Sequence, residues 1–111
     1  MIEDELTFRI ISLISPKAYI SSSSQIMQGC IIEPMAVVHT GCIISKGCFI
    51  SSGAVINYGS MCCDCACIEC NATISERSIV PAGTKVLKGS VFENNSPKIN
   101  DLFVDFKKEN P

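Results

Sequence analysis

Basic residues are few and scattered in this sequence, which argues against two large classes of partner. Lys and Arg together number 9 of 111 residues, charged residues make up only 18%, and the net charge is −2. No run of Lys or Arg occurs anywhere in the chain. Proteins that bind nucleic acid or an anionic membrane surface usually carry such runs. We therefore expect no nucleic acid and no membrane as partner.

Long apolar runs and a secretory leader are missing as well. No apolar stretch reaches the roughly 18 residues that a transmembrane helix needs. The first residues, MIEDELTF, are acidic and lack the positive region that opens a signal peptide. We therefore expect a cytoplasmic, single-domain protein, and the eight cysteines fit a reducing compartment that tolerates free thiols.

A six-residue period is what the sequence does contain. An apolar residue recurs at every sixth position from Ile14 to Phe92, fourteen times without an insertion, and a small residue stands two positions before each. All seven glycines share one phase, directly before the small residue: Gly29, Gly41, Gly47, Gly53, Gly59, Gly83 and Gly89. In a short strand the small and the aliphatic residue would both point inward. The remaining two residues would turn a corner at positive φ, which Gly and Asn tolerate.

Three such strands and corners close a triangular coil of 18 residues. The sequence therefore predicts an all-β, parallel β-helix over residues 14–95, with a stack of Ile and Val inside. Residues 1–13 are predicted to form an N-terminal arm or strand. Residues 96–111 are predicted to form a short C-terminal α-helix and tail, because Ile99, Leu102, Phe103 and Phe106 would share one helix face. A loose tail is the alternative for this last segment.

The pattern aliphatic-x-x-Gly-small-x resembles the hexapeptide repeat of left-handed β-helix acyltransferases. The stretch ISSGAVINYGS is similar to the N-T-G-A-x-V-E-H-D-C signature of the bacterial sialic acid O-acetyltransferase and sugar N-acetyltransferase group. This resemblance covers about residues 9–91. It implies a left-handed coil, a homotrimer, acetyl-CoA as co-substrate, and a sugar or nucleotide-sugar as acceptor. We expect no counterpart of the N-terminal sugar-binding domain of that group within these 111 residues.

Outward positions that a monomer would fill with polar residues are apolar here. The residue before each inward aliphatic is apolar in six successive repeats: Ile31, Val37, Ile43, Phe49, Val55 and Met61. Stacked over 18-residue coils, such residues form columns, of which Ile43, Met61 and Ile79 are one. Apolar patches of this size usually mark an interface. The columns therefore agree with the trimer that the resemblance implies.

The candidate site lies where the signature places its histidine. The resemblance implies a histidine that acts as general base after a glutamate, but this chain carries Asn57 and Tyr58 there. A phenol is a far weaker base than an imidazole at neutral pH. The one histidine, His39, precedes Asn57 by one coil, so both should lie on the same face. We therefore predict His39, Asn57 and Tyr58 as catalytic residues; His39 as an ordinary surface residue is the alternative.

The neighbouring columns complete a polar cluster. Thr40, Ser75 and Glu76 fall beside the three predicted catalytic residues and are predicted to bind substrate or cofactor. The function predicted is transfer of an acetyl group from acetyl-CoA to a sugar amine or hydroxyl. The alternative is a catalytically degenerate homologue that serves as a trimeric scaffold or assembly partner. Tyr58 at the base position and the early closing segment VPAGTKVLKGS favour the alternative.

The segment MCCDCACIEC, residues 61–70, looks like a metal cluster, but its phases argue against one. Cys62 takes an inward position, and Cys63, Cys65, Cys67 and Cys70 are distributed around one coil, so they cannot converge on one tetrahedral ion. We therefore expect no metal. A bond between Cys67 and Cys70, or a metal shared with a symmetry mate, stays open. A single histidine also argues against the γ-class carbonic anhydrases, a related hexapeptide family that needs three.

Overall fold

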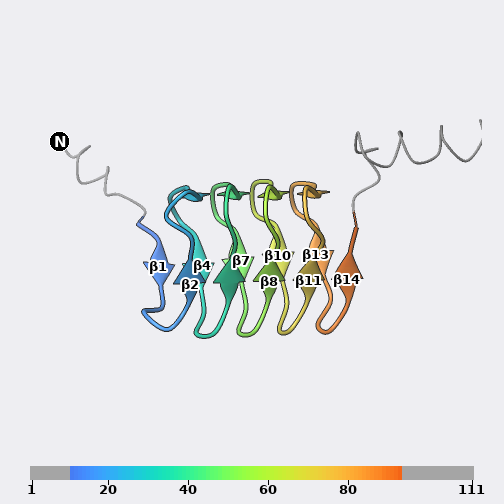
Figure 1. Cartoon of the computed structure of the whole chain (residues 1–111), viewed down its shortest axis with the longest axis horizontal. Helices are drawn as coiled ribbons and strands as arrows, with labels where there is room; N and C mark the ends of the chain where they lie inside the picture. Colours follow the sequence, from blue (N-terminus) through green and yellow to red (C-terminus); the bar gives the residue numbers. More distant parts are fainter. Residues whose placement is uncertain (1–10, 94–111) are drawn as a thin grey trace, which may run out of the picture.

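Short parallel strands wound into a rod make up the part of the protein that the structure describes. The computed structural model describes residues 11–93, in which fourteen two-residue strands follow one another at six-residue intervals (Figure 1). They are β1 (Leu13–Ile14), β2 (Tyr19–Ile20), β3 (Gln25–Ile26), β4 (Ile31–Ile32), β5 (Val37–Val38), β6 (Ile43–Ile44), β7 (Phe49–Ile50), β8 (Val55–Ile56), β9 (Met61–Cys62), β10 (Cys67–Ile68), β11 (Thr73–Ile74), β12 (Ile79–Val80), β13 (Lys85–Val86) and β14 (Val91–Phe92). The predicted strand-and-corner repeat is confirmed.

Each strand pairs with the strand that lies three positions later in the sequence, one full coil further along the rod. Face A is the sheet β1-β4-β7-β10-β13, face B is β14-β11-β8-β5-β2, and face C is β12-β9-β6-β3. All pairs are parallel with a register of 18 residues, so Ile32 pairs with Ile50 and Ile50 with Ile68. The chain is therefore a parallel β-solenoid of about four 18-residue turns, as the sequence predicts. Figure 1 shows the coils side by side along the rod.

A dry column of branched aliphatic side chains fills the rod. Ile32, Ile50 and Ile68 are at most 1% exposed, and the small inward residues, such as Ala54 and Cys42, are fully buried beside them. Each fully buried isoleucine contributes roughly 1.5–3 kcal/mol relative to an exposed one. The stack therefore supplies most of the driving force that holds the coils in register.

The corners need a left-handed residue, and the sequence supplies more than glycine there. All seven glycines have φ between 69° and 79°, and Asn71 has a φ of 58°. The expectation of Gly or Asn at every such corner is incomplete, because Met35, Cys65 and Arg77 also adopt positive φ. These three side chains point away from the crowded core, since Met35 is 65% exposed and Cys65 and Arg77 are exposed as well.

The type of each small inward residue depends on the corner fifteen residues later, in the next coil, and on whether that corner closes its own turn hydrogen bond. Where a corner lacks its own turn hydrogen bond, a Ser or Cys fifteen residues earlier donates to the open carbonyl. Such donors include Ser12 to Met27, Ser24 to His39, Cys30 to Ser45, Cys42 to Asn57 and Ser60 to Ser75, at 2.5–3.0 Å. Where the corner closes its own turn, as it does when Ala54 N–H donates to Ser51 O at 3.2 Å, the residue fifteen positions earlier is Ala, here Ala36. Cys48 is the exception, because it donates to Cys63 O, which also accepts from Ala66 N–H. Alternation of Ser or Cys with Ala thus satisfies the backbone of each corner.

Two predicted segments lie outside the described residues. These are residues 1–10 of the N-terminal arm and the C-terminal helix over 96–111. Within residues 11–93 the chain forms strands and corners and no helix. Correspondingly, no helix in this range is long and apolar enough to cross a bilayer.

Candidate active site

The predicted catalytic column lies at one edge of face B. His39, Asn57 and Ser75 directly follow β5, β8 and β11 on successive coils. The backbone ladder fixes their register, because His39 N–H donates to Ile56 O at 2.9 Å and Asn57 N–H donates to Ile74 O at 3.0 Å. Neighbouring parallel strands are about 4.8 Å apart. The fold therefore places the one imidazole of the chain next to Asn57.

Thr40, Tyr58 and Glu76 occupy the corner between faces B and C, which we call the BC corner. Its layers are joined by Gly59 N–H, which donates to Thr40 O at 3.0 Å, and by Arg77 N–H, which donates to Tyr58 O at 2.9 Å. The structure thus brings all six predicted site residues together on one stretch of surface. Their chemical roles stay predictions.

The backbone of the catalytic column is held from inside the rod. Ser24 Oγ donates to His39 O at 2.5 Å, Cys42 Sγ to Asn57 O at 3.0 Å, and Ser60 Oγ to Ser75 O at 2.8 Å. The BC corners in this column are therefore fixed by side chains of the preceding coil. The sequence reasoning missed this support, although the phase of the small residues contained the signal.

The side chains of the cluster differ in whether they already make hydrogen bonds within the protein. Asn57 Nδ2 donates to Ile74 O at 2.9 Å, so the amide is tied to its own sheet. Thr40 Oγ1 lies 3.4 Å from Ser21 Oγ. The half-buried imidazole of His39 makes no side-chain hydrogen bond to any residue between 11 and 93. The unprotonated ring nitrogen can therefore accept a proton from a substrate, which is what a general base must do.

Tyr58 is engaged with a residue that sequence reasoning did not select. The guanidinium carbon of Arg77 lies 5.7 Å from the centre of the Tyr58 ring, within the range of a cation–π contact. Tyr58 is 48% exposed and Arg77 is exposed too. Arg77 follows Tyr58 by one coil and one residue, so the 18-residue period could have indicated it.

Three hollows among residues 11–93 lie away from this cluster. One of about 470 Å³ lies beside β1 and β4, and one of about 250 Å³ lies at the corner between faces C and A. The third, of about 300 Å³, lies on face A beside Phe49, Cys67 and Cys70. None of the three is lined by His39 or Tyr58. Thr40 and Tyr58 are themselves exposed, so in one protomer this part of the candidate site is open to solvent.

Cysteine chemistry does not add a nucleophile to the site. Cys42, Cys48 and Cys62 are buried, and burial raises the pKa of all three thiols, that of Cys48 to about 11. A thiol with a raised pKa is a poor nucleophile at neutral pH. All eight cysteines are free, so the bond between Cys67 and Cys70 is not formed. Within residues 11–93 no three His, Cys, Asp or Glu side chains are grouped to hold a metal ion.

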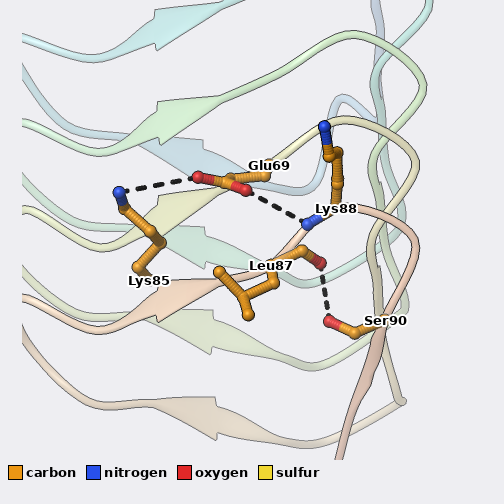
Figure 2. Close-up of polar contacts among 5 residues, drawn as sticks. All are labelled: Glu69, Lys85, Leu87, Lys88 and Ser90. Atoms are coloured by element: carbon orange, nitrogen blue, oxygen red, sulfur yellow. Dashed lines mark hydrogen bonds and ion pairs between the residues drawn. The ribbon is translucent and has the colours of Figure 1, made fainter.

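The hollow on face A is bordered by charges that already pair with each other. Figure 2 shows the Glu69 carboxylate reaching to the next coil, where it lies 3.6 Å from Lys85 Nζ and accepts a 3.1 Å hydrogen bond from Lys88 N–H. In the same view Ser90 Oγ donates to Leu87 O at 2.6 Å. These contacts join coils and occupy both oxygens of the Glu69 carboxylate. We therefore place the candidate site on face B and not here.

Neither a protein-family model nor a curated protein matches the chain. Solved structures resemble it at low identity. The acetyltransferase domain of PglB from Neisseria gonorrhoeae in complex with acetyl coenzyme A is 23% identical, with a TM-score of 0.42 over 86% of this chain and 60% of that one. A mutant GDP-perosamine N-acetyltransferase from Caulobacter crescentus, in complex with CoA and GDP-perosamine, is 16% identical, with a TM-score of 0.41 over 81% of this chain and 58% of that one. This chain thus spans less than two thirds of either structure, and it is similar in fold to acetyltransferases whose complexes hold CoA or acetyl-CoA.

Proposed function

We propose that the protein is an acetyl-CoA-dependent acyltransferase that transfers an acetyl group to the amine or hydroxyl of a sugar or nucleotide-sugar. The proposal includes a left-handed solenoid and a homotrimer in the cytoplasm. The observation that carries it is the stacking of His39 beside Asn57 and Tyr58, at a register fixed by the backbone ladder. The hexapeptide signature that this column overlaps supports the same chemistry.

In this function His39 takes the proton from the acceptor as the acceptor attacks the thioester carbonyl. The new C–N or C–O bond would form as the C–S bond breaks, and the departing CoA thiolate would take up the proton from the imidazolium. An imidazole suits the task because it exchanges protons near neutral pH. Thr40, Ser75 and Glu76 flank it and would hold hydroxyl groups of the acceptor. The rigid support from Ser24 beneath the His39 backbone keeps the base in place between turnovers.

The test is acetyl transfer measured with and without the imidazole. His39→Ala should lower the rate of transfer by about 100-fold or more, the usual contribution of a general base, with little change in melting temperature. Added imidazole should restore part of that rate, since it refills the missing base. Thr73→Ala is the matched control, because Thr73 is half-buried on the same face and should leave the rate within a factor of two or so.

A second candidate, a trimeric scaffold without catalysis, is favoured by one observation. The position that carries the base in the signature holds Tyr58, whose ring is engaged by Arg77 at 5.7 Å. A scaffold predicts that acetyl-CoA at millimolar concentration leaves the melting temperature unchanged and that the His39→Ala chain assembles as the wild type does. A rise in melting temperature with acetyl-CoA would instead support the acyltransferase.

A further inference from the structure

Arg77 carries the one fixed positive charge of the BC corner within residues 11–93. The corner recurs in four coils, at residues 21–24, 39–42, 57–60 and 75–78. Apart from the imidazole of His39, the charged side chains in these four segments are Glu76 and Arg77. The whole chain has a net charge of −2, so its overall field does not attract an anion. An anionic substrate at the candidate site therefore depends on a local cation, and Arg77 is the one in place.

The side chain of Arg77 is directed onto the candidate site by the residue below it. In the preceding coils its column holds Gly41 and Gly59, both at a φ of 69°, and Arg77 keeps the same left-handed backbone at 53°. A methyl group at Gly59 would lie 3.1 Å from Arg77 Cγ, so the bare glycine leaves room for the stem of the arginine. The stem ends with its guanidinium carbon 5.7 Å from the centre of the Tyr58 ring. The arginine is thus held over the preceding coil, where the candidate site lies.

The guanidinium keeps its hydrogen-bond donors for a ligand. Between residues 11 and 93 the side chain of Arg77 has no ion pair and no hydrogen bond, while its backbone N–H donates to Tyr58 O at 2.9 Å. Contact with the face of an aromatic ring stabilises the cation without using its N–H groups as donors to oxygen. The planar edge of a guanidinium matches two oxygens of a phosphate, with a charge-assisted hydrogen bond to each. A phosphate group is therefore the ligand that this side chain fits best.

The place of Arg77 relative to the candidate base indicates which substrate carries that phosphate. The guanidinium lies on the ring of Tyr58, one coil from His39, and neighbouring coils are about 4.8 Å apart. CoA has its thioester and its diphosphate at opposite ends of the long pantetheine arm, so its phosphates are far from the base while the thioester reacts. A phosphorylated sugar has its phosphate within about one ring of its amine or hydroxyl. The acceptor, and not CoA, thus suits this position.

We infer that Arg77 binds the phosphate of the acceptor, and that the acceptor is a sugar phosphate or a nucleotide-sugar and not a free sugar. The inference rests on the proposed function and narrows its substrate. Thr40 and Ser75 would then hold sugar hydroxyls while Arg77 holds the charge. Arg77 binds and takes no part in proton transfer, so its loss should act on the affinity for the acceptor and not on the chemical step.

The first experiment compares ligands with and without a phosphate by isothermal titration calorimetry. Wild type should bind glucosamine 1-phosphate or UDP-glucosamine at least about tenfold more tightly than glucosamine, and the tighter of the two identifies the source of the phosphate. Arg77→Gln should reduce this preference to within about twofold. Arg77→Lys should keep part of it, because lysine retains the charge without the planar fork. Lys88→Gln, which removes an exposed cation at the corner between faces A and B, is the matched control and should keep the full preference.

The second experiment measures acetyl transfer and separates binding from stability. Arg77→Gln should raise the KM for the phosphorylated acceptor by about tenfold, leave kcat within about twofold, and change neither the acetyl-CoA affinity nor, beyond a small surface effect, the melting temperature. Wild type without a preference for the phosphorylated ligand, a preference that survives Arg77→Gln, or a loss confined to acetyl-CoA affinity would each overturn the inference. Phosphate binding that depends on Arg77 in a protein that transfers no acetyl group would refute the acyltransferase and leave the phosphate site standing.

Discussion

At the scale of the residue, one hydroxyl can hold two backbone groups of the next coil. Ser60 is 1% exposed, its Oγ donates to Ser75 O at 2.8 Å, and the same oxygen accepts a hydrogen bond from Ser78 N–H at 3.2 Å. Ser60→Ala removes both bonds inside a buried site. We expect the free energy of unfolding to fall by about 2 kcal/mol, the cost of leaving buried polar groups without these partners. Urea unfolding followed by circular dichroism measures the change.

Ser90→Ala is the matched control for that hydroxyl. Ser90 Oγ donates to Leu87 O at 2.6 Å, but Ser90 is exposed and its own N–H also donates to Leu87 O. Its loss should therefore cost less than about 0.5 kcal/mol, as for other surface substitutions. Equal losses for the two serines would contradict the role given to the buried hydroxyl.

At the scale of the element, the corners differ in how well their residue suits a left-handed backbone. Met35 adopts a φ of 69° and is 65% exposed, so its side chain gains little from packing. A side chain at such a φ costs about 1 kcal/mol, and glycine avoids this cost but loses more entropy on folding. We expect Met35→Gly to raise the free energy of unfolding by about 0.5 kcal/mol, measured by urea titration.

Gln28→Gly tests the same argument with the opposite sign. Gln28 is an exposed corner residue whose φ lies outside the left-handed region, and it precedes Gly29. Glycine there relieves no strain and should destabilise the protein by about 0.5–1 kcal/mol. Stabilisation by both substitutions, or by neither, would show that φ does not decide the stability of these corners.

At the scale of the whole molecule, the thiols inside the rod set a limit on stability at alkaline pH. Burial raises the pKa of Cys42, Cys48 and Cys62 above the ordinary value of 9.0 for a thiol, to about 11 for Cys48. The native rod therefore keeps these protons while the unfolded chain releases them as the pH passes 9. Since the native state then binds more protons, stability falls as pH rises from 9 to 11. The midpoint of urea unfolding should be constant below pH 8 or so and decrease above it.

Cys48→Ala should make that alkaline decline shallower. Cys48 Sγ donates to Cys63 O at 3.1 Å, but this carbonyl also accepts from Ala66 N–H at 3.1 Å, so the variant leaves no carbonyl without a partner. Cys65→Ala, at an exposed thiol, is the control and should not change the slope. A wild-type midpoint that is flat up to pH 11 would contradict the linkage.

The sequence by itself determined the solenoid. A strict six-residue period without insertions predicts that the aliphatic residue recurring every sixth position is buried in one stack, and the observed pairing of Ile32, Ile50 and Ile68 follows from arithmetic on residue numbers. The same arithmetic placed His39 beside Asn57, and Thr40, Tyr58 and Glu76 in the corner next to them. Such predictions succeed because a solenoid is nearly one-dimensional, so sequence distance converts directly into spatial distance.

Only the tertiary structure decided what each corner does with its backbone and side chains. The period places Ser24, Cys42 and Ser60 in one phase and Arg77 one coil beyond Tyr58, but it does not give the carbonyls to which these three side chains donate or the ring that Arg77 covers. Nor does it show that Met35 accepts a left-handed φ. These features depend on hydrogen-bond directions and rotamers, which the six-residue pattern leaves free. The hollows at the corners arise in the same way, because they form between coils and not within a repeat.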